Sequence, residues 1–189
     1  MKVYHGTIFS SAMNIMAQGV KLNYSQKMLD FGKGFYTTPD KKHAISTAKH
    51  KAFRHNQKYR KDAMEREVPA VVTLEYIEDE GLSIKAFESH DQEWKNFILA
   101  NRSTDTIVEK YGIIEHNLDN RYDIVKGEIA DGSIAQKAVQ VRNEGCTYWE
   151  IDVKDLLVEG EDAYGYQISF HTEKSLHCIK PRRCDIIFK

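Results

Sequence analysis

The sequence contains little cysteine. Three cysteines are present, an odd number without a CxxC pair, at Cys146, Cys178 and Cys184. Such a set predicts neither a structural zinc site nor a disulfide framework, and it fits a reducing cytosol. His43, His50 and His55 also lack the HExxH spacing of zinc-dependent hydrolases. We therefore expect a cytoplasmic protein without a metal ion.

Long apolar runs and an excess of either charge are also missing. The N-terminal stretch MKVYHGT has no apolar h-region, so we expect no signal peptide. No apolar run is long enough to span a bilayer, which predicts no membrane partner. Lys and Arg number 27 against 28 Asp and Glu, and a net charge of −1 favours neither nucleic acid nor membrane as a partner.

What is present is an ordinary globular composition, with 41% hydrophobic residues among 189 and no repeat or linker. This length predicts a single domain spanning residues 1–189. Strands at both ends with helices between them indicate the α+β class. The strands are expected at 2–5, 35–38, 68–77, 82–87, 122–131 (interrupted at Gly127), within 166–179 and at 184–189. The helices are expected at 10–18, from 41 onwards, at 90–102, at 133–143 and at 152–160.

Helical spacing also predicts which side chains face the core. In the first two helices these are Met13, Ile15, Met16, Ile45, Ala48, Ala52 and Tyr59. In the helix at 90–102 they are Trp94, Phe97 and Ile98. Asp40 is expected to cap the helix that starts at about Lys41, and Gly19 to end the first one.

Three motifs carry residues suited to chemistry. YHGT ends the first strand, DFGKGFYTT leads into the second, and YQISFHT forms a late strand, with His5, Tyr36 and Gln167 as their central residues. Each residue also has a structural interpretation: His5 as a hydrogen-bonded structural histidine, Tyr36 as a core tyrosine, and Gln167 as an edge-strand polar residue. Only the combination of the three motifs, in this order, is informative.

Together these motifs resemble the His-Tyr-Glu branch of ADP-ribosyltransferases, which includes diphtheria toxin and the poly-ADP-ribose polymerases. With EWKNFILANR and YDIVKGEIAD, they are similar to one uncharacterised family of bacterial ADP-ribosyltransferase-like domains. The resemblance runs from residue 3 to about residue 180. It implies a split core of two antiparallel sheets with flanking helices and an NAD-binding cleft between the sheets.

The resemblance also implies a role for each motif residue, with NAD as the substrate. The backbone N–H and C=O of Gly6 would pair with the nicotinamide carboxamide, and glycine allows that close approach. His5 would bind a ribose hydroxyl, and Thr7 could add another hydrogen bond. Tyr36 would stack on the nicotinamide ring. Gly32 and Gly34 would give the backbone room to turn into the pocket.

The third motif departs from the branch, because Gln167 stands where a catalytic glutamate is expected. Glutamine can hydrogen-bond a ribose hydroxyl, but it supplies no charge to oppose a cationic transition state. Strand alternation puts Ser169, His171 and Glu173 on the same face. Glu173 lies about 20 Å further along an extended strand, which is too far to replace the missing carboxylate.

The resulting functional hypothesis is a mono-ADP-ribosyltransferase with an unknown acceptor, which could be protein, nucleic acid or a small molecule. A bacterial toxin or defence effector, with an antitoxin or small partner protein, is one role the resemblance implies. A non-enzymatic NAD or ADP-ribose binding module is the main alternative. NAD glycohydrolase activity and a purely structural α+β domain also remain open.

Several further residues have two interpretations. The basic helix face is either solvated or a contact for a phosphate-bearing acceptor, and it comprises Lys51, Arg54, Lys58 and Lys61. Asn101 and Arg102 either reach the pocket or cap their helix, and Asp131 either caps the next helix or faces the cleft. The polar segment 22–33 is a candidate lid.

Overall fold

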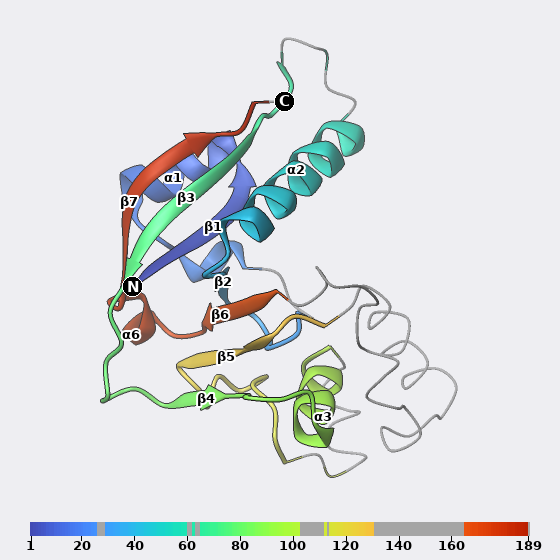
Figure 1. Cartoon of the computed structure of the whole chain (residues 1–189), viewed down its shortest axis with the longest axis vertical. Helices are drawn as coiled ribbons and strands as arrows, with labels where there is room; N and C mark the ends of the chain where they lie inside the picture. Colours follow the sequence, from blue (N-terminus) through green and yellow to red (C-terminus); the bar gives the residue numbers. More distant parts are fainter. Residues whose placement is uncertain are drawn as a thin grey trace. The chain divides into compact units, whose positions relative to one another are not determined.

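The computed structural model describes residues 1–25, 29–59, 62, 65–102, 112, 114–130 and 165–188. The described residues form four α-helices, one 3-10 helix and seven strands in two sheets, which confirms the α+β class (Figure 1). The chain divides into two compact units. The first unit comprises Met1–Lys21, Tyr36–Gly81 and Glu173–Lys189, and the second comprises Leu22–Phe35 and Leu82–Thr172. Whether the chain is one domain stays a prediction.

The first unit contains a three-stranded antiparallel sheet in the order β1-β3-β7. Its strands are β1 (Lys2–Ile8), β3 (Pro69–Tyr76) and β7 (Ile179–Ile186). The central strand β3 therefore pairs with strands from both ends of the chain (Figure 1). Ala70, Val71, Val72 and Leu74 of β3 are all completely buried, so both faces of this strand are covered.

Three helices belong to the first unit: α1 (Phe9–Gln18), α2 (Lys41–Lys58) and the short α6 (Glu173–Leu176). Asp40 caps α2 by accepting a hydrogen bond from the Lys42 backbone N–H at 2.8 Å, as the sequence predicts. Helix α2 packs on β1 and β3 through the buried alanines Ala44 and Ala48. Small side chains at these positions let the helix backbone approach the sheet closely.

The second sheet has the strand order β2-β6-β5-β4. Its strands are β2 (Phe35–Thr37), β6 (Tyr166–Phe170), β5 (Ile124–Glu128) and β4 (Ile84–Ala86). Strands β5 and β6 are antiparallel, but β4 and β5 are parallel. The sheet is therefore mixed, whereas the resemblance implies an antiparallel sheet. The reason is the connection between β4 and β5, which contains helix α3 (Gln92–Asn101) and a long further segment instead of a hairpin turn.

An aromatic cluster forms the core of the second unit. Trp94, Phe97 and Ile98 of α3 are completely buried, which confirms the predicted inward face. Phe31 lies 6.0 Å from Phe87 and 6.2 Å from Phe97 between ring centroids. Gly127 continues β5 rather than interrupting it. A Cβ at this position would lie 3.1 Å from the Phe31 ring and 3.2 Å from Phe87. The glycine makes room for the aromatic rings.

Other sequence-based expectations were wrong in detail. Strand β1 continues through Gly6 to Ile8 instead of stopping at Gly6. Met13 is 47% exposed and Tyr59 is 54% exposed, because Ala12 and the alanines of α2 make the buried contacts. The late strand ends at Phe170, and Glu173 begins helix α6, so Glu173 does not share the strand face of Gln167.

Some expectations fall outside the described residues: the helices at 133–143 and 152–160, Asp131, and Cys146. Within the described part of the chain, no helix is both long and apolar enough to cross a membrane.

Candidate functional site

The edge of strand β1 presents backbone groups next to the YHGT motif. The Tyr4 N–H donates to the Thr38 carbonyl at 2.8 Å, and the Thr38 N–H donates back at 2.9 Å. Backbone groups two residues apart in a strand point the same way, so the N–H and C=O of Gly6 face this same edge, away from β3. The Gly6 carbonyl accepts a hydrogen bond from the Lys51 ammonium at 2.9 Å, which agrees with that direction.

Gly6 is required in this strand by the helix that crosses it. A Cβ at Gly6 would lie 2.0 Å from the Ala44 carbonyl oxygen of α2 and 2.9 Å from the Ala48 nitrogen. No side chain fits into that space, whether or not a ligand binds at the strand edge. The glycine of YHGT therefore has a packing role that the sequence alone did not reveal.

His5 is held as a neutral imidazole. Its Nδ1 lies 2.6 Å from the Tyr36 carbonyl oxygen, and because a carbonyl only accepts, Nδ1 carries the proton and Nε2 is an acceptor. Burial and the nearby Lys51 ammonium lower the His5 pKa to about 3, although the bond to Tyr36 opposes the shift. A fixed tautomer with an accepting Nε2 suits recognition of a hydroxyl donor.

Lys51 is exposed as a residue, yet its ammonium end reaches back to the Gly6 carbonyl. Desolvation there lowers the Lys51 pKa to about 8. Lys51 therefore differs from a fully solvated lysine of the predicted basic face. It places a positive charge beside His5 and at the carbonyl that the sequence-based hypothesis assigns to nicotinamide.

The glycines of DFGKGFYTT are explained by neighbours within the second unit. A Cβ at Gly34 would lie 2.7 Å from Nδ1 of His171 and 2.8 Å from the Phe170 carbonyl oxygen. Gly32 has φ +90°, a conformation that favours glycine. A Cβ added at Gly32 would lie 3.1 Å from the Asn117 carbonyl oxygen. Both glycines therefore allow protein groups to pack closely.

His171 connects this loop to strand β6. Its Nδ1–H donates to the Lys33 carbonyl at 2.9 Å, and its Nε2 lies 2.8 Å from Ser169 Oγ. Burial lowers the His171 pKa to about 4, so the ring is neutral at physiological pH. The contact between Ser169 and His171 agrees with the strand alternation expected for these two residues.

Gln167 is buried in the second unit, with 6% exposure. Its Nε2 donates to Oδ2 of Asp30 at 3.0 Å. Asp30 is itself buried, and its Oδ1 accepts a bond from Arg102 Nε at 2.7 Å. Sequence reasoning missed Asp30 as a partner of Gln167. The signal available was a charged residue at the start of a motif otherwise rich in glycine and aromatic residues.

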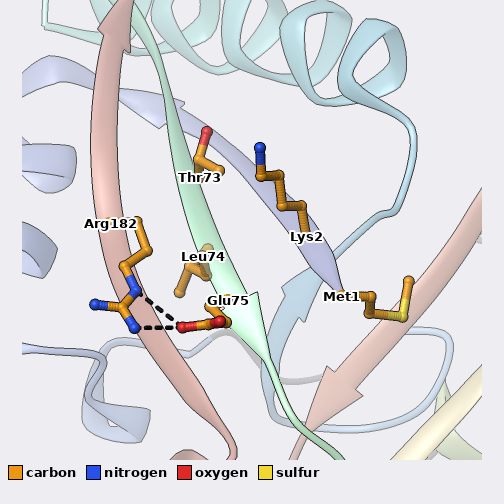
Figure 2. Close-up of a pocket in the computed structure, with 6 residues that line it drawn as sticks. All are labelled: Met1, Lys2, Thr73, Leu74, Glu75 and Arg182. Atoms are coloured by element: carbon orange, nitrogen blue, oxygen red, sulfur yellow. Dashed lines mark hydrogen bonds and ion pairs between the residues drawn. The ribbon is translucent and has the colours of Figure 1, made fainter.

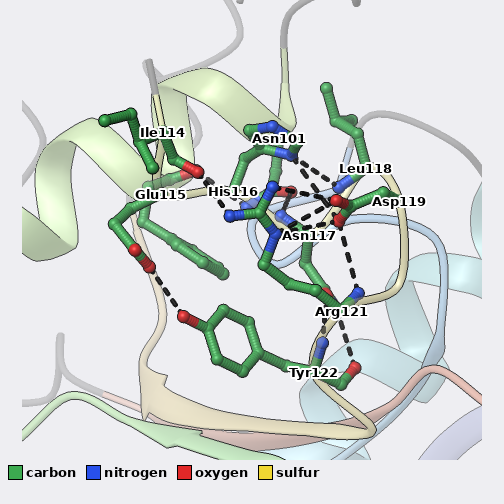
Figure 3. Close-up of polar contacts among 10 residues, drawn as sticks. Asn101, Ile114, Glu115, His116, Asn117, Leu118, Asp119, Arg121 and Tyr122 are labelled. Atoms are coloured by element: carbon green, nitrogen blue, oxygen red, sulfur yellow. Dashed lines mark hydrogen bonds and ion pairs between the residues drawn. The ribbon is translucent and has the colours of Figure 1, made fainter.

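Asn101 and Arg102 at the end of α3 have separate roles. Asn101 Oδ1 accepts from the Asn117 backbone N–H at 2.8 Å, and its Nδ2 donates to the Phe97 carbonyl at 2.8 Å. Figure 3 shows Asn101 within the polar contacts of segment 114–122, where Arg121 also bonds the Ile114 carbonyl. Asn101 therefore anchors this segment to α3, whereas Arg102 pairs with Asp30.

The predicted site residues fall into two groups. His5, Gly6, Thr7 and Tyr36 belong to the first unit, while Gly34 and Gln167 belong to the second. Within the first group, the structure joins His5 to the Tyr36 backbone, with Thr7 buried and Tyr36 half-buried. That the two groups converge on one NAD molecule stays a prediction.

A pocket of about 410 Å³ lies elsewhere on the first unit. Figure 2 shows its lining residues, with Arg182 bonded to Glu75 across neighbouring strands: Met1, Lys2, Thr73, Leu74, Glu75 and Arg182. None of them is a predicted site residue. Among the described residues, no group of three or more His, Cys, Asp or Glu side chains could hold a metal ion.

Comparisons with known proteins give a family assignment. No curated protein and no solved structure matches the chain significantly. The family model described as "Protein of unknown function (DUF3990)" matches residues 1–180, nearly the whole chain. This chain therefore belongs to the DUF3990 family.

Proposed function

We propose that this protein is an NAD-dependent mono-ADP-ribosyltransferase. The observation that carries the proposal is the edge of β1, where Gly6 presents an N–H and a C=O beside His5. A primary carboxamide has one acceptor and one donor group, which such a backbone pair matches. The Gly6 carbonyl oxygen has two lone pairs, so it can accept from a carboxamide as well as from Lys51.

His5 supports the same ligand. Its Nε2 is an acceptor at every pH above about 3, where the imidazole is neutral. A ribose hydroxyl is a donor that fits this atom. We propose that the nicotinamide riboside part of NAD binds along the β1 edge, with Tyr36 stacked on the nicotinamide ring.

The proposed reaction breaks the bond between ribose C1′ and the nicotinamide nitrogen. The electron pair leaves with nicotinamide, C1′ becomes oxocarbenium-like, and an acceptor nucleophile bonds to C1′ and releases its proton. Gln167 would accept a hydrogen bond from a ribose hydroxyl but would supply no charge. We therefore expect slow turnover compared with an enzyme that has glutamate at this position.

A second candidate function is a binding module for NAD or ADP-ribose that performs no chemistry. The uncharged Gln167, held by Asp30 in a buried hydrogen bond, favours this alternative. If the protein is a transferase, we propose a toxin or defence effector that acts on a bacterial protein, nucleic acid or small molecule. A neutralising antitoxin or small partner protein belongs to the same proposal.

The test uses NAD labelled on its adenylate phosphate, incubated with the protein and a bacterial lysate. Label on a macromolecule would establish a transferase and identify the acceptor class, whereas label released only as ADP-ribose would indicate NAD hydrolysis. His5→Ala should abolish either product. His50→Ala, at an exposed position of α2 in the same unit, is the matched control. Absence of turnover together with measurable NAD binding would favour the binding module, and absence of both would refute the proposal.

A further inference from the structure

Asp30 lies at the centre of a buried polar cluster with Gln167 and Arg102, and the sequence alone indicated no role for this aspartate. Asp30 is 4% exposed and Gln167 is 6% exposed. One carboxylate oxygen of Asp30, Oδ1, accepts from Arg102 Nε at 2.7 Å, and the Arg102 NH2 group also contacts it. The other oxygen, Oδ2, accepts from Gln167 Nε2 at 3.0 Å, with the Ala130 backbone N–H at 3.4 Å.

These contacts fix the orientation of the Gln167 amide. A carboxylate oxygen only accepts hydrogen bonds, so the amide must turn its NH2 group toward Asp30. Its carbonyl oxygen, Oε1, must therefore point away from Asp30. Arg102 compensates the charge of Asp30, which allows the carboxylate to remain buried.

We infer that Asp30 is a positioning residue that makes Gln167 present its carbonyl oxygen, and not its NH2 group, to the ribose of the ligand. This inference rests on the proposed function, because only NAD chemistry gives Oε1 a ribose hydroxyl to bind. Without Asp30 the amide could rotate by half a turn and offer a donor to a hydroxyl that needs an acceptor. Asp30 acts through Gln167 and does not touch the reacting atoms.

The same geometry determines what a glutamate at position 167 would do. Gln167→Glu would place a second carboxylate beside Asp30, and two carboxylates this close share one proton. Because Arg102 donates hydrogen bonds to the Asp30 carboxylate, the shared proton would lie on the introduced glutamate. At neutral pH that glutamate would then be uncharged and would add no electrostatic stabilisation.

The other neighbours of Gln167 do not change this expectation. Gly127, its partner on β5, has no side chain. The charged residues on either side of it, Lys126 and Glu128, point to the opposite face of the sheet by strand alternation. Strand β2 (Phe35–Thr37), which lies next to β6 on its other side, carries no charged residue. His171, further along the same face, bonds Ser169 and the Lys33 carbonyl. Asp30, with Arg102 bonded to it, is the ionisable group that the Gln167 side chain contacts.

The orientation is tested first without NAD. In protein labelled with ¹⁵N, the side-chain NH2 signals of Gln167 are assigned by their loss in Gln167→Glu. We expect them to exchange slowly with solvent in the wild type and to shift in Asp30→Ala. Asp30→Asn keeps one accepting oxygen for two donors, and with that oxygen bonded to Arg102 its NH2 group faces Gln167, so the protection of the Gln167 NH2 group should be lost in this variant too. Glu88→Gln, an exposed position in the same unit, is the control. Unchanged Gln167 signals in Asp30→Ala would overturn the inference.

The second test measures nicotinamide release from NAD as a function of pH. We expect Asp30→Ala to lower kcat by about ten- to a hundredfold with a much smaller change in KM, and Asp30→Asn, whose NH2 group would turn the Gln167 amide around, to lower kcat as well. Gln167→Glu should be no faster than wild type at pH 7 and should gain activity as the pH rises and the shared proton is lost. Asp30→Asn combined with Gln167→Glu removes the competing carboxylate, so this variant should be faster than Gln167→Glu at pH 7.

The outcomes separate the inference from the proposed function. Gln167→Glu exceeding the wild-type rate at pH 7, with a flat pH profile, would overturn the role of Asp30 while supporting NAD chemistry. No turnover and no NAD binding in any variant would refute the proposed function, and with it the assignment of ribose as the group that Gln167 faces. A shift of the Gln167 signals in folded Asp30→Ala would still establish that Asp30 holds the Gln167 amide.

Discussion

At the residue scale, the protein holds two histidines in a neutral form by burying them against backbone carbonyls. His5 donates from Nδ1 to Tyr36 in the first unit, and His171 donates from Nδ1 to Lys33 in the second. In both residues burial is the largest cause of a lowered pKa, to about 3 and about 4 respectively. Each imidazole ring therefore donates a hydrogen bond to a backbone carbonyl that is distant in sequence. The same burial disfavours the protonated, charged form of the ring.

The lowered pKa of His171 predicts that the protein becomes less stable in acid. The unfolded state binds a proton near pH 6.5, whereas the folded state resists it until about pH 4. Stability is thus complete above about pH 6.5 and falls as the pH drops toward 4, by about 1.4 kcal/mol per pH unit for this histidine. Urea unfolding of His171→Asn at several pH values should show a shallower decline than wild type. An equal decline in His171→Asn would contradict the prediction, and His50→Asn is the exposed control.

A second prediction at the residue scale concerns the reactivity of the Lys51 amine. With a pKa near 8, a larger fraction of this amine is uncharged at pH 8 than for an ordinary lysine. Brief treatment with an acylating reagent, followed by mass spectrometry, should therefore modify Lys51 before Lys49, which is exposed on the same helix. NAD should protect Lys51 if it binds at the β1 edge. Preferential modification of Lys49 would show that the Lys51 ammonium does not hold the Gly6 carbonyl.

At the scale of elements, the contact between β1 and α2 depends on the absence of side chains. Ala44 and Ala48 face the strand from one side, and Gly6 faces them from the other. The helix backbone can then approach so closely that the Lys51 side chain, also on α2, reaches the Gly6 carbonyl. The position of this candidate site residue thus depends on a packing contact.

Gly6→Ala should therefore destabilise the protein strongly. The added Cβ would lie 2.0 Å from the Ala44 carbonyl oxygen, which is backbone and cannot move without shifting α2. We expect a loss of at least about 2 kcal/mol in the free energy of unfolding, measured by urea denaturation with circular dichroism. Gly81→Ala is the control, because the atom nearest to its added Cβ is an oxygen of the Asp79 carboxylate, at 3.2 Å. This side chain is exposed and can move aside. Similar stabilities of the two variants would contradict the close contact.

At the scale of the whole molecule, both compact units are built from segments distant in sequence. The first unit uses three segments and the second uses two, so neither corresponds to a continuous stretch of chain. In the second unit, the short segment Leu22–Phe35 supplies Phe31 to the aromatic core and Asp30 to the polar cluster. A fragment without this segment would lack both.

Phe31→Ala tests the division into two units. Removing a completely buried phenylalanine should cost about 3–5 kcal/mol. Hydrogen exchange followed by mass spectrometry should show the loss of protection first in β5 and β6 of the second unit. Leu74→Ala, which removes an equally buried side chain of β3, should instead increase exchange in β1, β3 and β7. Identical exchange patterns in the two variants would show that the chain unfolds as one unit.

Local patterns predicted the elements well where one signal dominated. The Asp40 cap, the glycine at position 19 and the inward aromatic face of α3 all follow from residues close in sequence, and the structure confirms them. The predicted core face of α1 was wrong at Met13, which is 47% exposed, whereas Ala12 is completely buried and Ile15 and Met16 are half-buried. Alanine carries little hydrophobic signal, so periodicity undervalues a helix that packs through small side chains.

The sequence by itself determined the α+β class and the three motifs, because caps, turns and strand patterns depend on neighbours along the chain. Only the tertiary structure decided what those motif residues contact. Gly6 meets α2, Gly34 meets His171, and Gln167 meets Asp30, each across at least about thirty residues of sequence. Such contacts depend on which elements pack together, and no local pattern encodes the partner of a buried carboxylate or of a missing side chain.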